Sequence, residues 1–562
     1  MIEPIADYVI VGGGTAGCVL AERLSRDGSQ VVLVEAGPDT PPGATPANIL
    51  DIYPSSQADP SYFWPLDDVK TGLEQAGGVF RPIWRFGQAR VLGGGGSVMG
   101  MIALRGLASD YDAWSSSGCR GWSWADVLPY FRCLEADVDF TGELHGISGP
   151  IPIRRVMPQH WPQFLHVASR ALAEQGHQEL GDMNGEVSCG FGPTPKSCTP
   201  AERVCSAQAY LTQEVRSRPN LRVRTGVRVR QIVFEGKRAT GVVIDADGGS
   251  QIPARTVILS AGAIASPALL LRSGVGPADQ LRSAGIDTVS DLPGVGANLQ
   301  NHPMLTIAAH LRPEMRQSRA VREMCSLWLR YSSGVPGCPE ADMAGNILAS
   351  IAPSAAASGI GGVGATIYKP HSLGSVRLAS ADPYAAPEIR FNLLSDDRDR
   401  QRMAEALARC LGFLAQSPVR EAVTDVFIPD PSWPMRLGGR GPLPAIKNEI
   451  VAKALDIGLL RRHLLGRNRL DVDALLRDRS AVDEIALAIT GLGGHVAGTC
   501  RMGDIEDPAT VVDPCCRVKG MAGLRVIDAS IMPRLVAANT NLPVQMIAER
   551  AADLVLADGN VR

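Results

Sequence analysis

The stretch "DYVIVGGGTAGCVLAERLSRDGSQVVLVEAG", residues 7–37, decides the fold of the N-terminal part of the chain. Residues 8–11 are all apolar, which is typical of a parallel strand buried on both faces. Gly12, Gly14 and Gly17 follow in G-x-G-x-x-G spacing, and an apolar helical face then leads to a second apolar run at 31–35. This succession of strand, glycine turn, helix and strand predicts a dinucleotide-binding unit.

Each position in this unit has a physical task. Gly12 permits the tight turn, Gly14 lets the backbone approach a pyrophosphate, and Gly17 lets the helix pack closely on the strand. The free N–H groups at the start of the helix bind phosphates. Glu35 ends the second strand and can accept hydrogen bonds from ribose hydroxyls. Because an acid at this position repels a 2′-phosphate, the pattern favours FAD or NAD over NADP.

The composition is that of an ordinary globular protein. Its 562 residues, 45% of them hydrophobic and 20% charged, are too many for one core and predict at least two domains. The net charge of −3 gives no basic face and excludes a typical nucleic-acid-binding protein. The twelve cysteines include no CxxC pair, and HExxH is absent, so we expect reduced thiols and no metal site. No signal peptide or long apolar span is visible, which predicts a cytoplasmic protein without a transmembrane segment.

Further glycine-rich motifs follow along the chain. "RVLGGGGSVM", residues 90–99, holds four consecutive glycines, which exclude a helix interior and let the backbone lie against a planar group. The others are "GAIASPALLLRSGVG" at 262–276, "LPGVGANLQNHP" at 292–303, "GLRVIDASIMP" at 523–533 and "AANTNLPVQ" at 537–545. In content and order, these motifs resemble those of the glucose–methanol–choline oxidoreductase family of FAD enzymes over nearly the whole chain.

A few positions depart from the family pattern. Met99 stands where the family usually has Asn or His, Gly95 and Gly96 stand where serines are common, and Asn301 stands where Asp is typical. In some members a histidine links covalently to the flavin, and the matching residue here is Val98, which has no nucleophile. The resemblance therefore implies non-covalent FAD.

The resemblance also implies which residues contact FAD. Val229 would meet its adenine end, and Asp528 and Ala529 its ribityl and pyrophosphate region. The full predicted set is Gly12, Gly14, Thr15, Ala16, Gly17, Glu35, Ala36, Trp64, Arg90, Leu92, Gly93, Gly94, Gly96, Val98, Met99, Val229, Ala261, Gly262, Asp528, Ala529, Asn539 and Thr540.

The resemblance implies an α/β fold with a Rossmann-like FAD-binding domain and a substrate-binding domain built on an antiparallel sheet. The FAD-binding domain would comprise residues 1–155, 201–311 and 491–562, and the substrate-binding domain residues 312–490, with a substrate-side segment at 156–200. Alternating residues predict a small antiparallel sheet within 218–248 and strands of the substrate-side sheet within 369–394. We expect an irregular Pro- and Gly-rich stretch at 429–444, and at 459–479 either an insertion or lid or a solvated amphipathic helix with a charged face.

The stretch "GLGGHVAGTCRMG", residues 491–503, matches the family's catalytic motif H-x-x-G-T-x-x-M-G. His495 occupies the position of the catalytic histidine, and Asn539 that of a second residue, which is His or Asn in the family. Alcohol oxidation by flavin needs a base for the hydroxyl proton while the α-carbon gives a hydride to flavin N5, and an imidazole with a pKa near working pH suits this task. Asn539 would orient the substrate oxygen through its amide N–H. We expect Cys500 to be a packed small hydrophobe and His302 to be structural.

Together these motifs predict an FAD-dependent alcohol oxidoreductase that turns a primary alcohol into an aldehyde, with O2 or another electron acceptor. Residues 341–368 hold no acid after Asp342, so an anionic cage for a quaternary ammonium is not expected, and a neutral alcohol is favoured. One alternative is a hydroxynitrile lyase on the same FAD scaffold. Another is a nicotinamide dehydrogenase with a simple Rossmann domain, but the C-terminal return at 523–541 has no role in such an enzyme.

Overall fold

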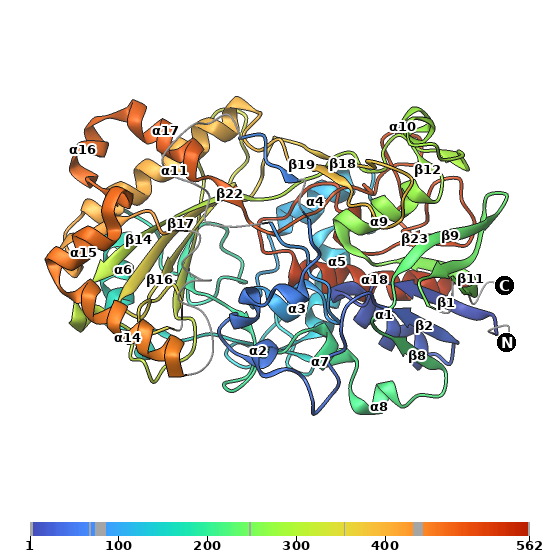
Figure 1. Cartoon of the computed structure of the whole chain (residues 1–562), viewed down its shortest axis with the longest axis horizontal. Helices are drawn as coiled ribbons and strands as arrows, with labels where there is room; N and C mark the ends of the chain where they lie inside the picture. The colour runs from blue at the N-terminus through green and yellow to red at the C-terminus, as the bar shows by residue number, and fades with distance from the viewer. Residues whose placement is uncertain are drawn as a thin grey trace.

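Two large sheets, in opposite halves of the molecule, organise the fold (Figure 1). The computed structural model describes residues 4–66, 69–73, 86–246, 249–352, 354–430 and 442–559. The sheet on the right of the figure takes its strands from three distant stretches, 6–34, 221–259 and 524–526. The sheet on the left is built mainly from residues 303–492.

The first sheet has seven strands, five of them parallel. All four residues of β2 are buried, as expected for a parallel strand with both faces covered. The parallel strands lie in the order β8 (Leu221–Arg224), β2 (Val31–Val34), β1 (Ala6–Val11), β11 (Gln251–Leu259) and β23 (Leu524–Val526). β10 (Arg238–Ile244) and β9 (Val229–Glu235) extend β11 in antiparallel orientation.

The antiparallel sheet predicted within residues 218–248 is only partly correct. β9 and β10 form a hairpin, but β8 pairs in parallel with β2. Without β8, the edge of β2 would leave a row of backbone N–H and C=O groups unpaired. Leu221 and Val223 pack against the core at this edge, which favours the parallel pairing.

Helices α1 (Thr15–Arg26) and α18 (Asn541–Gly559) pack side by side in the first half. Arg23 of α1 forms ion pairs with Glu549 and Asp553 of α18. Glu549 also accepts a hydrogen bond from the Tyr210 hydroxyl in α7 (Ser206–Tyr210), at 2.7 Å. The last helix of the chain therefore completes the domain that the first strand begins.

The second sheet has eight strands, and all its neighbouring strands are antiparallel. α6 (Gln163–Glu174), α11 (Asp397–Ala415) and α17 (Arg479–Ile489) pack against it. Trp328, Ala344 and Tyr368 instead join the hydrophobic core of the first half. The strands lie in the order β21 (Arg469–Leu470), β20 (Val423–Phe427), β14 (Pro303–Leu311), β17 (Ile360–Ile367), β16 (Met343–Leu348), β15 (Ser326–Tyr331) and β6 (Gly190–Pro193), and β22 (Gly491–Leu492) also pairs with β14. The predicted α/β class, with a second domain on an antiparallel sheet, is confirmed.

The strands expected within residues 369–394 do not join this sheet. β18 (Ser375–Arg377) and β19 (Glu388–Arg390) form a separate sheet with β3 (Val69–Lys70), because alternation indicates a strand but not its partner. The stretch 459–479, for which we expected an insertion or lid or a helix with a charged face, lies in α15 (Gly458–Leu465), β21, α16 (Val472–Arg477) and the turns beside them. α15 exposes leucines as well as Arg462. Of the stretch 429–444, expected to be irregular, residues 431–441 lie outside the described residues, and residues 442–444 begin helix α14 (Pro442–Asp456), against that expectation.

The remaining α-helices and strands of the described residues lie in the connections between the elements above, and most of them are short. They are α2 (Ala47–Leu50), α3 (Gly95–Val98), α4 (Ala108–Ser116), α5 (Trp124–Leu134), β4 (Glu135–Asp137), β5 (Ile151–Arg154), β7 (Lys196–Ser197), α8 (Gln213–Arg216), α9 (Gly262–Arg272), β12 (Val275–Gly276), α10 (Ala278–Ser283), β13 (Ser290–Asp291), α12 (Val419–Ala422) and α14 (Pro442–Asp456). None of the helices in the described part of the chain has the length and apolar character needed to cross a bilayer.

Gly17→Ala should destabilise the protein. An added Cβ would lie 1.9 Å from the carbonyl oxygen of Gly12, so α1 would have to move away from the turn. We expect a loss of about 1–3 kcal/mol, seen as a lower melting temperature of the purified protein. Gly412→Ala is the matched control: Gly412 lies inside α11, an added Cβ there meets nothing within 4 Å, and alanine is the better helix former. Equal melting temperatures for the two variants would contradict the packing argument.

Candidate active site

The glycine turn between β1 and α1 is closely packed at one glycine and open at the next. Gly12 has a φ of +102°, and an added Cβ there would lie 2.5 Å from the carbonyl oxygen of Ser260. Gly14 has neither restriction, because its φ is −76° and an added Cβ would meet no protein atom nearer than 3.8 Å. Gly14 is the N-cap of α1, so this open space lies where the backbone N–H groups from Thr15 onward can bind phosphate. The turn therefore fits a dinucleotide pyrophosphate.

Glu35 is buried at the end of β2, next to this turn. Its carboxylate accepts hydrogen bonds from the backbone N–H groups of Gly13 and Gly37, at 2.8 and 2.7 Å. Burial raises the pKa of Glu35, and these hydrogen bonds oppose that rise. Each oxygen keeps a further lone pair, so the carboxylate can hold the turn in shape and still accept from a ribose hydroxyl.

The glycine run at 93–96 packs against the same turn. The N–H of Gly93 donates to the carbonyl oxygen of Gly13 at 2.7 Å, and a Cβ on Gly94 would lie 2.8 Å from Cα of Gly14. The sequence excluded this run from a helix interior, and the structure places Gly95 and Gly96 at the start of the one-turn helix α3. Glycine destabilises the interior of a helix, but these two glycines lie in the first turn, so this loss of stability is not incurred.

Val98 and Met99 follow this run. Val98 is fully buried against apolar neighbours that include Ile49 and Tyr62, and Met99 is partly buried beside them. Sequence reasoning missed Arg203, whose buried guanidinium donates to the carbonyl oxygens of Gly96, at 3.0 Å, and of Met99. Burial lowers the pKa of Arg203 to about 10. No motif marked this arginine, because its partners are backbone atoms more than 100 residues away.

Trp64 and Arg90, both in the predicted FAD set, lie together. The Arg90 guanidinium is 5.5 Å from the centroid of the Trp64 ring, and that of Arg228 lies 5.2 Å from the same ring. Arg228 directly precedes Val229, the first residue of β9. The structure thus brings Trp64 and Arg90 together, with Val229 next in the chain to Arg228. Leu92 lies against the glycine turn at Gly13.

Asp528 ties the C-terminal return to the start of α9. Its buried carboxylate accepts hydrogen bonds from the N–H of Gly262 at 2.8 Å, the hydroxyl of Ser266 at 2.6 Å and the N–H of Ser530 at 2.8 Å. Ala261 and Ala529, both predicted contacts, directly precede two of these donors. Farther on, the Thr15 hydroxyl donates to Asn541 Oδ1 at 3.0 Å, immediately after Thr540. Residues from both ends of the chain therefore meet at the N-terminus of α1.

His495 and His302 are brought together by the pairing of β22 with β14. Pro303 pairs with Leu492, so the residue before β14 lies near the residues after β22. The N–H of Gly493 donates to the carbonyl oxygen of His302 at 2.9 Å, and the two histidine Nδ1 atoms are 2.9 Å apart. Sequence reasoning took His302 as structural only, because the two residues are 193 positions apart.

Asn539 lies on the other side of His495. Its amide Nδ2 is 2.9 Å from His495 Nε2. An amide nitrogen only donates, so His495 Nε2 is the acceptor and its Nδ1–H donates to His302 Nδ1. The three side chains thus fix one tautomer of His495, with the lone pair on Nε2. Asn301 supports the arrangement, since its Oδ1 accepts from the backbone N–H of His495 at 2.9 Å.

Burial keeps both histidines neutral. It lowers the pKa of His495 to about 4 and that of His302 well below its ordinary value. The expectation of a His495 pKa near working pH is therefore wrong for this structure. Asn539 Oδ1, His302 Nε2 and Asn301 Nδ2 are buried with no hydrogen-bond partner. Buried polar atoms normally have partners, so this cluster fits a ligand with polar groups.

Cys500 is fully buried, and burial raises the pKa of its thiol well above the ordinary value. A protonated, inaccessible thiol is a poor nucleophile. These properties agree with its predicted role as a packed hydrophobe.

Glu135, Asp137 and His145 are a group whose ligand atoms lie within 4.8 Å of one another, as a metal site would require. Arg105 forms an ion pair with Glu135, and Arg155 with Asp137. Hydrogen bonds to carboxylates raise the pKa of His145 to about 10, although burial opposes this, so it is also a cation. The acids are therefore neutralised by protein groups, and we assign no metal to them.

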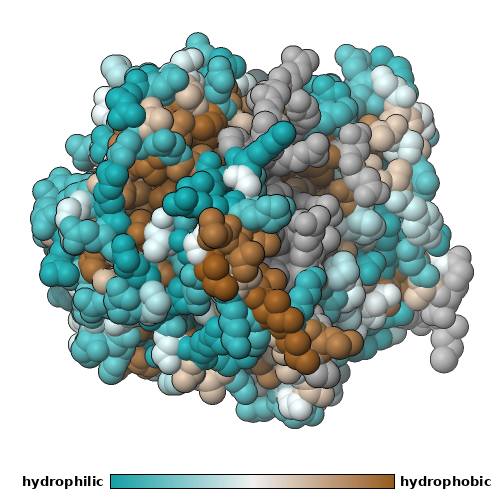
Figure 2. Space-filling view, turned by 60° about the vertical axis from the view of Figure 1, so that its left-hand side comes forward, coloured by the Kyte–Doolittle hydropathy of each residue, from teal (hydrophilic) through white to brown (hydrophobic). Residues whose placement is uncertain are grey.

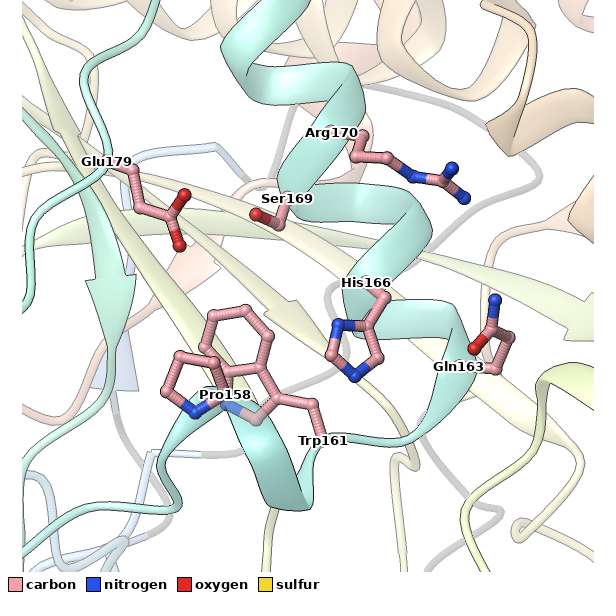
Figure 3. Close-up of a pocket in the computed structure, with 7 residues that line it drawn as sticks. All are labelled: Pro158, Trp161, Gln163, His166, Ser169, Arg170 and Glu179. Carbon is pink, nitrogen blue, oxygen red and sulfur yellow. The ribbon is translucent and has the colours of Figure 1, made fainter.

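A separate surface cavity of about 530 Å³ lies along α6 (Figure 3). Trp161 and His166 line it with ring centroids 5.8 Å apart, Arg170 lies farther along the helix, and Glu179 lies on a separate segment across from it. None of the predicted cofactor or catalytic residues lines this cavity, so we do not assign the chemistry to it.

Comparisons with known proteins cover nearly the whole chain. Two family models described as GMC oxidoreductase match residues 6–304 and 370–548. The chain is 38% identical to the 5-(hydroxymethyl)furfural oxidase of Methylovorus sp., over 99% of each chain. It is 33% identical to the oxygen-dependent choline dehydrogenase of Brucella anthropi, over 98% of this chain and 95% of that one. The structure of pyridoxine 4-oxidase from Mesorbium loti matches with a TM-score of 0.78 and 28% identity, over 98% of each chain.

Glu35→Ala should weaken dinucleotide binding. Each lost hydrogen bond to the charged acceptor is worth roughly 1.5–3 kcal/mol, so we expect a higher dissociation constant for FAD and a lower flavin content after purification. Glu35→Gln keeps one acceptor oxygen, so its dissociation constant for FAD should lie between those of Glu35→Ala and the wild type. Acid precipitation of the wild type should release all its flavin, because Val98 offers no nucleophile. We call the turn between β1 and α1 together with Glu35 the dinucleotide cradle. Unchanged flavin retention in the alanine variant would count against this assignment.

Proposed function

Because the chain belongs to the GMC oxidoreductase family, whose members act on CH–OH donors, we propose that it oxidises a primary alcohol group on an aromatic ring to the aldehyde. The observation that carries this proposal is the neutral His495 paired with Asn539 next to a dinucleotide cradle. The cofactor is FAD, and we propose that it is bound without a covalent link.

The cradle residues would hold FAD at its phosphates and ribose. Gly14 and the first turn of α1 would bind the pyrophosphate, and Glu35 would bind a ribose hydroxyl. The C-terminal return around Asp528 would contact the part of FAD beyond the pyrophosphate. When bound, FAD supplies the acceptor for the hydride that leaves the alcohol carbon.

His495 would accept the hydroxyl proton of the alcohol at Nε2. The fixed tautomer places the lone pair on this atom, and the low pKa keeps it unprotonated. The alcohol hydroxyl would replace the Asn539 amide as the hydrogen-bond donor to this lone pair. Asn539 would give its amide N–H to the substrate oxygen and align it for proton transfer. His302 acts as a positioning residue, because its Nδ1 holds the Nδ1–H of His495.

The choice of alcohol rests on a buried acid and on the relatives. Asp342 is fully buried, and its carboxylate is already bound by Arg402 at 2.8 Å and by Ser333. It is therefore unavailable to attract a quaternary ammonium group. 5-(Hydroxymethyl)furfural and pyridoxine, named in two similar proteins, both carry hydroxymethyl groups on an aromatic ring. These observations support a neutral aromatic alcohol.

His495→Ala should retain the fold and the flavin, since glycines shape its turn. Its rate of anaerobic flavin reduction by the alcohol should fall by on the order of 10²–10⁴, the usual contribution of a positioned base. Asn539→Ala should cost less, about 1–3 kcal/mol, because it removes one hydrogen bond. Cys500→Ser should be nearly silent. Stopped-flow absorbance of the three variants measures this order, and an inactive Cys500 variant beside an active His495 variant would refute the assignment.

The wild type provides the accompanying test of reaction class. An aromatic alcohol should bleach the flavin under anaerobic conditions and yield the aldehyde. Readmitted air or an artificial dye then identifies O2 or another compound as the electron acceptor. Cleavage of a cyanohydrin without bleaching would instead establish a lyase on the same scaffold.

The pH dependence follows from the lowered pKa of His495. A histidine with a depressed pKa is deprotonated, and active as a base, at every pH above that pKa. We therefore expect kcat/KM to stay level from about pH 8 to about pH 5 and to fall only as pH approaches 4. A loss of activity centred near the ordinary histidine value would show that His495 is solvated in the working enzyme. His495→Ala, measured over the same range, removes the histidine contribution and serves as the control.

A further inference from the structure

Helices α14 and α15 and the residue between them expose several large apolar side chains. Seven residues between 443 and 464 are involved, and Leu443 and Leu459 are the most accessible, at 79% and 81%. Figure 2 shows a hydrophobic stripe on this side of the molecule, which belongs to the half that holds the eight-stranded sheet. We call this surface the α14–α15 face, and its apolar residues are Leu443, Ile446, Ile450, Ile457, Leu459, Leu460 and Leu464.

Helix α14 is apolar on two opposite sides. Its inner side, with Ala452 and Leu455, packs towards the eight-stranded sheet, where Leu455 meets a small core that includes Phe427. Its outer side carries Ile446 and Ile450 at helical spacing, both more than half exposed. A helix that lies on a protein surface normally has a polar outer side, so this pattern calls for a second apolar partner.

The same segment is basic. Between residues 442 and 469 the chain holds six Lys or Arg and two acids, although its overall charge is −3. Two of the six, Arg461 and Arg469, pair with Asp425, whereas Lys453, Arg462 and Arg467 are exposed. Both acids are engaged by arginines of the protein body, Glu449 by Arg319 at 2.7 Å and Asp456 by Arg316. Exposed apolar side chains flanked by basic residues are the pattern of helices that lie in the headgroup region of a membrane.

The segment is firmly attached to the fold. Arg461 of α15 donates to Asp425 of β20 at 2.5 Å, and Arg469 donates to the other oxygen of Asp425 at 2.9 Å. The α14–α15 face is therefore a preformed surface on the eight-stranded sheet, and docking would not need to order it.

We propose that the α14–α15 face docks the protein peripherally on an anionic phospholipid bilayer. Its isoleucines and leucines would enter the acyl boundary, and Lys453, Arg462 and Arg467 would lie among the headgroups. A second copy of the chain fits this face less well. A two-fold contact sets a patch against itself, so it would bring these cations together.

The test is co-sedimentation of the purified, full-length, FAD-loaded protein with vesicles. We expect binding to vesicles of phosphatidylcholine with roughly one-third phosphatidylglycerol, weaker binding at high salt, and little binding to phosphatidylcholine alone. A triple variant, Ile446→Ser, Ile450→Ser and Leu459→Ser, should lose at least about tenfold in vesicle affinity. A triple variant of exposed apolar residues elsewhere, Val138→Ser, Ile147→Ser and Ile505→Ser, should bind like the wild type.

A second variant separates charge from apolar contact. Lys453→Gln, Arg462→Gln and Arg467→Gln together should reduce binding to anionic vesicles and flatten its salt dependence. Activity on a soluble alcohol should be unchanged in all variants, which confirms that they fold and bind FAD. The proposal is overturned if the wild type does not bind anionic vesicles or if the α14–α15 variants bind as tightly as the control. If instead the wild type is a dimer, the Ile446, Ile450 and Leu459 variant is a monomer, and neither binds vesicles, the face is the contact with a second copy of the chain.

Discussion

The buried carboxylate of Asp528 is the contact on which the arrangement of the site depends. It joins the start of α9 to the C-terminal return by accepting from Gly262, Ser266 and Ser530. The backbone of residues 529 and 530 in turn accepts from Gly498 and Cys500, so the loop that carries His495 is attached to the same return. An ionised carboxylate is costly to bury without such donors. The loop and the return therefore keep one arrangement, and the position of His495 follows from it.

His495 and Asn539, the pair to which we assign the chemistry, lie where the two halves meet. Asn539 comes from the segment that enters α18 in the first half, whereas His302 directly precedes β14 in the second. His495 stands between them and contacts both. Neither half alone can therefore hold the histidine in one tautomer. The two halves also share a core at their junction, since Trp328 and Tyr368 of the second half pack in the hydrophobic core of the first.

What could be predicted from the sequence was mostly local. The strand, glycine turn, helix and strand at 6–34 follow from apolar runs and from glycine spacing, both of which act over a few residues. The family motifs identified His495 and Asn539, but not that His302 contacts the histidine or that Arg203 binds the carbonyl oxygens of Gly96 and Met99. Those contacts arise from strand pairing and burial across long stretches of chain. The strands at 375–377 and 388–390 illustrate the same limit, since their alternation was recognised and their sheet was not.

The order of strands in the first sheet has a consequence for biosynthesis. β1 is translated long before three other elements of the same half: β11 begins at residue 251, β23 begins at 524, and α18, which covers α1, ends at 559. Long-range parallel pairing is slow, because a long loop must close before its contacts form. The edge of β1 that β11 covers and the side of α1 that α18 covers must therefore wait for segments that are translated much later. During that interval they are exposed to aggregation, and a chaperone that shields them would be most useful before the last helix emerges.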